Sequence, residues 1–311
     1  MGSRTIYAGM DQVAQSLPFT PAGKIFLVGD SDTAGYNDIV QKFGHHIANH
    51  YVTIDAAISA CTANRGDIVL VAPNHTENVT NGSIACDIAG VRIIGLGTGS
   101  LKPTLTWTAT DSKINVTAAN VSWENFRWTA GIGDVVTAVL HATAAQNTQY
   151  IDIEFYATST FNFINCYTLG AANISDGCRW ERNYLRTADA GQLALCITAA
   201  SHADLKFYDN YVVHAAAAAG LLTGAAADFL GIDVRGNFVQ TGQTDGAVGV
   251  LVITTGTASS GRIVDNDMKT ADAAANVAIP IASKVYAARN YIAGADEVGT
   301  VVSVGTLFDN T

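Results

Sequence analysis

Four acidic residues in the C-terminal half could approach one another on adjacent repeats and are the first candidates for chemistry. They are Asp209, Asp233, Asp265 and Asp267, with Arg235 and Arg262 nearby. Carboxylates gathered on one surface can bind Ca²⁺ or exchange protons with a sugar substrate, and an adjacent Arg can assist. Asp is also a common residue of exposed turns, so we interpret this group as turn residues without a catalytic role.

A second candidate follows the strand-like run Ile25-Phe26-Leu27-Val28. The next three residues, Gly29-Asp30-Ser31, resemble the first block of the SGNH hydrolases, in which the Ser is a nucleophile. That reaction also needs a base from a late Asp-x-x-His sequence. None of the seven histidines has Asp three residues before it, so we interpret the segment as a turn. The histidines are His45, His46, His50, His75, His141, His202 and His214.

Metal-binding residues are the third possibility. His46 and His50 have a spacing that can bind a metal ion on a helix, but no carboxylate or Cys completes a set around His45, His46 and His50. The five cysteines are widely spaced and form no Cys-x-x-Cys pair, which argues against a disulfide framework or a zinc site. We predict no metal site and no cofactor, and we expect most of the cysteines to be buried apolar residues.

Composition narrows the class of protein. The chain has 311 residues, of which 49% are hydrophobic and only 14% are charged, and its formal net charge is -10. The apolar content excludes a disordered chain, and scattered basic residues argue against nucleic-acid binding through phosphates. No stretch reaches the length of a membrane span. A chain so poor in charge is expected to bury part of its surface in an assembly or in repeated structure.

Internal repeats position these residues. Short alternating apolar pairs recur at intervals of 22 to 30 residues. Those used to define the register are Val69/Val71, Val91/Ile93, Val121/Trp123, Ile151/Ile153, Cys178/Trp180, Leu205/Phe207, Ile232/Val234, Gly261/Ile263 and Val285/Ala287. A third apolar cluster lies within most periods. Three short strands per period predict an all-β fold, a single-stranded right-handed parallel β-helix of about nine coils.

An Asn follows five residues after the first member of each of the last five pairs. These residues are Asn183, Asn210, Asn237, Asn266 and Asn290. Asn at a fixed turn position can adopt the left-handed conformation and bond its neighbours in the next coil, so we predict a structural Asn ladder. Asn125 looks like a displaced version, one residue early. Alternation also predicts that the aromatic residues Trp123, Trp180 and Phe207 point inward.

The two ends differ from the repeats and complete the predicted domain organisation. Residues 1–50 lack the repeat and are expected to form an N-terminal arm and a small subdomain. Residues 51–63 are expected to form a capping helix, because Thr53–Cys61 has helical apolar spacing and an uncapped solenoid end polymerises. The β-helix is expected over 64–297, and 298–311 is expected to be a closing tail. The alanines at Ala215–Ala219 and Ala225–Ala227 could form a close contact with another subunit or a tight inner turn.

Catalytic signatures of β-helix enzymes are missing. Pectin-active hydrolases carry an Asp-Asp pair, a Gly-His-Gly and an Arg-x-Lys, and this sequence contains none of the three. We therefore predict that the protein is not an enzyme.

Two sequence phrases carry a family resemblance. The run Thr53–Cys61 is followed by Gly66-Asp67-Ile68-Val69-Leu70-Val71-Ala72-Pro73-Asn74-His75-Thr76-Glu77 and then by Ala89–Gly97. These phrases resemble the right-handed parallel β-helix proteins of tailed bacteriophage virions, over about residues 24–101 in motif and over the rest in repeat pattern. The resemblance implies a virion structural protein, commonly trimeric, of the capsid decoration or cement type.

The expected function follows from that resemblance. We expect a homotrimer on the outer capsid surface, made in the bacterial host cytoplasm, that binds the major capsid protein and stabilises the head. No nucleic acid, membrane or catalytic residue is part of this expectation. The alternative is a tail spike that binds or degrades a host polysaccharide along the side of the solenoid.

Overall fold

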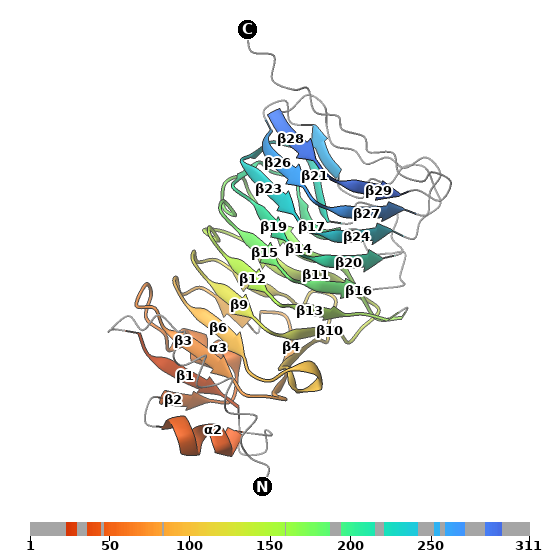
Figure 1. The fold of residues 1–311 in the computed structure, drawn as a ribbon. Helices are drawn as coiled ribbons and strands as arrows, with labels where there is room; N and C mark the ends of the chain where they lie inside the picture. The colour runs from red at the N-terminus through yellow and green to blue at the C-terminus, as the bar shows by residue number, and fades with distance from the viewer. Residues whose placement is uncertain are drawn as a thin grey trace.

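The computed structural model describes residues 23–29, 36–44, 47–82, 84–158, 160–186, 194–214, 221–241, 252–255, 259–270 and 284–293. Over these residues the chain is an all-β solenoid with very little helix, in which successive turns stack into a rod (Figure 1). Every strand pairing in the three large sheets is parallel, and from β3 onward each pairing joins one turn to the next, whereas β1 lies between β2 and β3. The predicted parallel β-helix is therefore confirmed at the level of fold class.

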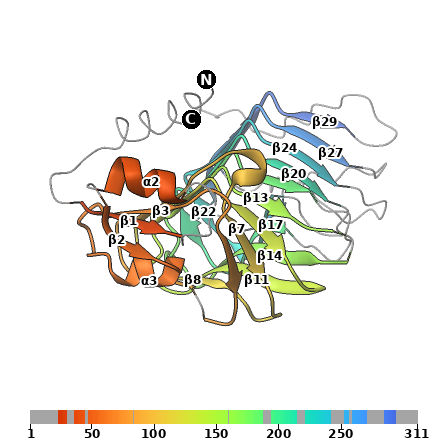
Figure 2. The same cartoon turned by 90° about the horizontal axis from the view of Figure 1, so that it is seen from below.

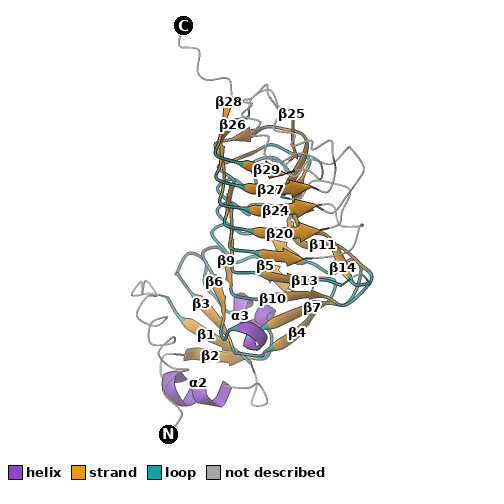
Figure 3. Cartoon of the chain, turned by 45° about the vertical axis from the view of Figure 1, so that its right-hand side comes forward, coloured by secondary structure: helices purple, strands orange, loops and turns teal. Residues whose placement is uncertain are grey.

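Three parallel sheets form the sides of the rod (Figure 3). Sheet A has the order β2 (Ile47–Tyr51), β1 (Ile25–Val28), β3 (Ile68–Val71), β6 (Arg92–Gly95), β9 (Ser122–Glu124), β12 (Gln149–Ile151), β15 (Arg179–Glu181), β19 (Lys206–Tyr208), β23 (Ile232–Arg235), β26 (Ser260–Val264) and β28 (Lys284–Ala288). Sheet B has the order β4 (Thr76–Val79), β7 (Thr104–Trp107), β10 (Arg127–Ala130), β13 (Glu154–Tyr156), β16 (Tyr184–Arg186), β20 (Tyr211–His214), β24 (Phe238–Thr241), β27 (Asp267–Thr270) and β29 (Tyr291–Ala293).

Sheet C has seven strands, so about seven turns contain a strand of all three sheets. Its order is β5 (Ile84–Cys86), β8 (Ile114–Val116), β11 (Asp134–His141), β14 (Asn162–Leu169), β17 (Ala194–Thr198), β21 (Leu222–Ala227) and β25 (Val252–Thr255). Two short strands, β18 (His202–Ala203) and β22 (Phe229–Leu230), pair separately. Beyond β25 the described residues add strands to sheets A and B only, and the count of nine coils stays a prediction.

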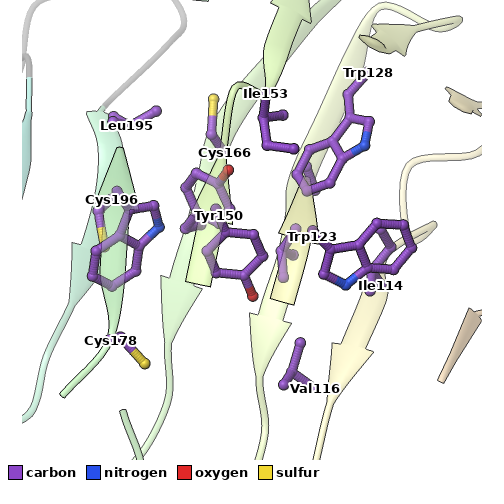
Figure 4. Packing of buried hydrophobic residues seen from close by; sticks show 14 of the residues in the cluster. Ile114, Val116, Trp123, Trp128, Tyr150, Ile153, Cys166, Cys178, Leu195 and Cys196 are labelled. Carbon is purple, nitrogen blue, oxygen red and sulfur yellow. The ribbon is translucent and has the colours of Figure 1, made fainter. Parts of the chain in front are cut away.

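The core is a continuous stack of inward side chains from all three sheets (Figure 4). In sheet A, Trp123, Tyr150, Trp180 and Phe207 occupy one register column, and each is fully buried. The rings of Trp180 and Phe207 lie parallel, with centroids 4.7 Å apart. Burying large rings contributes strongly to stability, and the inward prediction for Trp123, Trp180 and Phe207 is correct.

The sequence register was wrong in two turns. In the fourth complete turn the strand is Gln149–Ile151, so Tyr150 points inward where the pair Ile151/Ile153 was expected. The difference arises because Asp152 takes a left-handed corner conformation, with φ of 56°. In the first turn Val69 pairs with Ile93, two residues away from the expected alignment of Val69/Val71 with Val91/Ile93.

The N-terminal end adds two short helices to the rod (Figure 2). Helix α3 (Ile54–Ser59) begins at Thr53, whose side chain accepts a hydrogen bond from the Ala56 amide at 3.4 Å. Its apolar residues Ile54, Ala57 and Ile58 are buried in the solenoid core. Helix α2 (Tyr36–Phe43) instead packs Ile39 on the outer face of sheet A, within a second apolar cluster. A 3-10 turn, η2 (Gly99–Leu101), follows β6.

Several predicted features lie outside the described residues. They include most of the N-terminal arm (residues 1–22), Asp30 and Ser31 of the Gly-Asp-Ser turn, His45 and His46, the alanine run Ala215–Ala219 and the closing tail 298–311. Of the second alanine run, Ala225–Ala227, the backbone belongs to β21.

Candidate functional site

The five predicted ladder asparagines form one buried column at the corner between sheets A and B. Each lies in the short connection between a strand of sheet A and the next strand of sheet B, and none exposes more than 7% of its surface. The Nδ2 of Asn183 donates to Oδ1 of Asn210 at 3.0 Å, and the Asn183 amide donates to the same oxygen at 3.0 Å. This pattern repeats through Asn210, Asn237, Asn266 and Asn290.

Each ladder side chain also bonds a carbonyl of the preceding turn. Asn210 Nδ2, for example, donates to the Trp180 carbonyl at 3.1 Å, and Asn290 Nδ2 donates to Ile263 O at 2.8 Å. The Asn side chains bond buried main-chain groups at this corner, such as the Asn183 amide and the Trp180 carbonyl, and buried polar groups left unpaired are costly. One Asn side chain per turn therefore supplies hydrogen-bond partners to buried main-chain groups at this corner.

The residue before each ladder Asn has a left-handed backbone and forms an outer column. Its members with positive φ are Arg182, Asp209, Gly236, Asp265 and Arg289. Arg182 forms a bidentate ion pair with Asp152 of the turn before, and Arg289 forms one with Asp265. Asn125 belongs to this outer column and not to the ladder, because its φ is 65° and its Nδ2 bonds the carbonyls of Gly95 and Gly97.

The four acidic candidates do not converge on one site. Asp233 lies on β23 of sheet A and Asp267 on β27 of sheet B, while Asp209 and Asp265 lie at the corner between them. Asp265 is ion-paired with Arg289, whose hydrogen bonds hold the pKa of Asp265 below its ordinary value. Asp267 lies 3.3 Å from Lys269 Nζ. Asp209 and Asp265 are therefore turn residues, as interpreted from the sequence, whereas Asp233 and Asp267 belong to strands.

Asp233 is the centre of a charged cluster on the outer face of sheet A. It receives two hydrogen bonds from Arg262 at 2.8 Å and one from the Tyr208 hydroxyl at 2.7 Å. Burial raises the pKa of Asp233, but the bonds from Arg262 and Tyr208 outweigh burial and leave it below its ordinary value. The Tyr208 ring also lies under the guanidinium groups of Arg235 and Arg179, at 4.2 and 5.2 Å. An ionised Asp233 cannot act as a general acid.

A buried polar cluster inside the rod was not predicted. His141 Nδ1 lies 2.8 Å from Ser175 Oγ, and its Nε2 lies 2.7 Å from the Tyr150 hydroxyl. Cys178 Sγ donates to the Ala145 carbonyl at 3.2 Å and lies beside the same imidazole. Burial lowers the pKa of His141 to about 3, so this side chain is neutral. All of these groups are fully buried, so they bond one another and not a substrate.

The remaining His and Cys candidates have structural surroundings. His50 is exposed on β2, where its Nδ1 lies 2.8 Å from the Tyr36 hydroxyl. All five cysteines are buried and free, as predicted for most of them, and burial raises the pKa of the Cys86 and Cys178 thiols to about 12. Among the described residues, no group of three or more His, Cys, Asp or Glu side chains could hold a metal ion.

Sheet B carries a column of partly exposed aromatic rings. Tyr184, Tyr211 and Phe238 are register partners on adjacent turns, and their rings stack with centroids 5.1 and 4.8 Å apart. Lys269 Nζ covers the far side of Phe238 at 4.8 Å. Tyr211 is thus stacked on both of its faces, and Phe238 contacts both Tyr211 and the Lys269 ammonium. A sugar ring that stacks on an aromatic face would find few open faces in this column.

In the part of the chain that the structure describes, no helix has the length and apolar character needed to cross a membrane. Comparisons with protein-family models, curated proteins and solved structures gave no match to this chain.

Proposed function

We propose that the protein is a structural virion component of the capsid decoration type, without catalytic activity or a cofactor. In this proposal it is made in the bacterial host cytoplasm and assembles as a homotrimer on the outer capsid surface. There it binds the major capsid protein and stabilises the head. The proposal rests on the family resemblance together with the way the rod is built.

The observation that carries the proposal is that each turn is linked to the next by hydrogen bonds inside the rod and by ion pairs outside it. The Asn ladder ties successive turns in the interior. On the outside, ion pairs bridge adjacent turns, as in Arg92–Glu124, Arg127–Glu154 and Arg262–Asp233. Many of the few charged residues of this chain thus form ion pairs between adjacent turns of the rod. A stiff rod of this kind suits a protein that reinforces a lattice.

The finer fold predictions belong to the same proposal. We propose a right-handed path of about nine coils, with α3 as the cap of the first turn and with residues 1–50 as an N-terminal arm and small subdomain, of which the arm grips the capsid. Two contacts support the capping role: Glu77 Oε2 accepts from the Ile54 amide at 3.0 Å, and Asp55 Oδ1 accepts from the Ala85 amide at 2.8 Å. Carboxylates thereby fix α3 against the first turn at both sheets B and C.

Cryo-electron microscopy of virions that carry this chain tests the proposal. Density for the rod on the capsid shell is the expected result, and density at the tail alone would overturn it. A variant that lacks residues 1–22 should lose capsid occupancy while keeping the circular dichroism spectrum of the intact protein. Unchanged occupancy of that variant would refute the role of the arm and leave the capsid location standing.

A tail spike that binds an acidic polysaccharide is the second candidate. The cluster around Tyr208 favours it, because Arg179, Lys206, Arg235 and Arg262 outnumber the two carboxylates Glu181 and Asp233 on neighbouring strands of one face. Binding of an acidic host polysaccharide that is lost in Arg235→Glu and retained in Arg127→Glu would support this candidate. Equal binding by both variants would count against it.

A further inference from the structure

The outer faces of the three sheets differ sharply in charge. Strands of sheet A carry outward or edge charges at Arg92, Glu124, Arg179, Glu181, Lys206, Asp233, Arg235 and Arg262. Strands of sheet B carry charges at Glu77, Arg127, Glu154, Arg186, Asp267 and Lys269. The seven strands of sheet C contain one Asp, Asp134 at the start of β11, and no Glu, Lys or Arg. Sheet C is therefore the side of the rod whose strands carry the least charge.

One outward column runs along sheet C from β5 to β17. Strand register aligns Ala85, Asn115, Leu140, Thr168 and Ile197 on successive turns. The residues next to this column in each strand point into the core. Val139, which precedes Leu140, is fully buried, and Leu169, which follows Thr168, is 2% exposed. The column is thus a surface of small, branched and apolar side chains.

Polar groups of this face bond one another. The hydroxyls of Thr137 and Thr168 lie 3.1 Å apart on adjacent strands, and Asn165 Nδ2 donates to the Val136 carbonyl at 3.1 Å. At the edge of the same face, Val136 exposes 44% and Phe161 43% of its surface. Covering such a face removes apolar surface from water.

Charge decides which occupant fits this face. Two copies of a chain with a net charge of -10 repel each other, and they approach most easily through surfaces that bring no like charges together. Apart from Asp134 at the start of β11, the strands of sheet C meet that condition. Seven strands spaced by about 4.8 Å give a face on the order of 600 Å² in projection. That is close to the roughly 800 Å² that each partner contributes to a standard interface.

We infer that a second copy of this chain covers the outer face of sheet C. The inference rests on the proposed homo-oligomeric assembly and names the surface that forms it. In this arrangement sheet C is buried between copies, whereas the charged outer faces of sheets A and B remain exposed.

Charge introduced into the column tests the inference. Thr168→Arg places a cation at the centre of sheet C, and Asn115→Arg repeats the change two strands away. Thr129→Arg is the matched control, because Thr129 occupies an outward position on β10 of sheet B. Light scattering coupled to size-exclusion chromatography gives the mass of each protein, and circular dichroism reports whether each variant is folded.

The expected result is an oligomeric wild type and an oligomeric Thr129→Arg, with a folded Thr168→Arg or Asn115→Arg of monomer mass. A monomeric wild type at micromolar concentration would overturn the inference, as would folded sheet C variants that keep the wild-type mass. If the wild type is monomeric and Thr168→Arg still loses capsid occupancy, the face binds another protein and the second copy is excluded. Wild-type oligomers that fail to occupy the capsid would instead leave this inference standing and refute the proposed function.

Discussion

Asn210 directs both of its nitrogen donors at a single atom, Oδ1 of Asn237 in the next turn, with the amide at 3.0 Å and Nδ2 at 2.9 Å. Its own Oδ1 accepts the same two bonds from Asn183. Each ladder oxygen is thus shared by the main chain and the side chain of one neighbour. The ladder couples the position of the backbone in one turn to the position of a side chain in the next.

Removing one rung should therefore cost more than a single hydrogen bond. Asn210→Ala leaves the Asn183 amide and the Trp180 carbonyl without their partner in a buried corner. Unpaired buried polar groups cost roughly 1–3 kcal/mol each, so we expect a loss of about 2–5 kcal/mol in the free energy of unfolding. Urea unfolding followed by Trp fluorescence measures it.

Asn78→Ala provides the control for that measurement, because Asn78 is an exposed residue of β4. An exposed substitution of this type should change stability by no more than about 0.5 kcal/mol. Equal effects of the two substitutions would show that the ladder contributes no special stability.

The ladder could be predicted from sequence, and the His141 cluster could not. Asn183, Asn210 and Asn237 stand at one fixed offset from an inward pair, so a residue type repeats at a repeated position. His141, Ser175 and Tyr150 come from a strand of sheet C, a connecting turn and a strand of sheet A. His141 and Ser175 recur at no fixed interval, so no period reveals that they meet Tyr150.

The same reasoning explains the register errors. An inward aromatic column, Trp123–Tyr150–Trp180, was present in the sequence. The alternation of Ile151 and Ile153 indicated a different register for this turn. Asp152 takes the corner conformation that Arg182 takes one turn later, and Ile153 then fills the ladder position. Corner residues with positive φ are varied in type, so sequence spacing alone could not place this corner.

His141 makes the stability of the rod depend on pH. Its pKa in the folded protein is lowered to about 3 by burial, whereas an unfolded His has a pKa near 6.5. Between these two pKa values, His141 is therefore protonated in the unfolded chain and neutral in the folded chain. The contribution of a neutral His141 to the free energy of unfolding is fully present above about pH 6.5. It falls as pH decreases from there toward 3, by up to about 1.4 kcal/mol per pH unit.

His141→Gln separates this effect from general acid sensitivity. Gln keeps hydrogen-bonding capacity beside Ser175 and Tyr150 but does not titrate. We expect a lower thermal midpoint at pH 7.5 and a smaller further decrease between pH 6.5 and 4.5 than in the wild type. His202, whose pKa is also lowered by burial, should retain part of the pH dependence. Identical decreases in both proteins would contradict the assignment to His141.

Asp67 should be critical for the attachment of the N-terminal strand. Its buried carboxylate accepts bonds from the Lys24 and Thr62 amides and a bidentate pair from Arg65. Burial raises the pKa of Asp67, but these bonds outweigh it and leave the pKa below its ordinary value. The stability it adds is therefore present above about pH 4, the ordinary Asp range, and is lost as pH falls through the lowered pKa.

Asp67→Asn should destabilise the protein by about 2–4 kcal/mol at pH 7, because an amide cannot accept all four bonds and Arg65 loses its ion pair. Asp87→Asn, at an exposed position shortly after the first turn, is the control and should be nearly neutral. Hydrogen exchange followed by mass spectrometry should show faster exchange in β1 of Asp67→Asn alone. Unchanged exchange in β1 would show that other contacts hold this strand.

Gly236 tests how the outer corner column selects its residues. Its φ is +68°, and a Cβ at this position would lie 2.1 Å from Oδ1 of Asp209. Asn and Asp occupy the same corner at Asn125 and Asp152, and they tolerate the left-handed conformation better than β-branched residues. Asp209 is exposed, so its carboxylate can move aside. We expect Gly236→Asn to cost about 1 kcal/mol or less and Gly236→Val at least about 2 kcal/mol.

Gly82 supplies the comparison that separates backbone strain from crowding. Its φ is +71°, but a Cβ there would meet nothing within 4 Å. Gly82→Val therefore reports strain alone, and the excess loss in Gly236→Val reports contact with the neighbouring turn. If the two valine variants have the same thermal midpoint, stacking between turns does not restrict the corner. A larger loss at Gly236 would show that each turn limits the residue types its neighbour can carry, and that β-branched residues are disfavoured in the corner column for this reason.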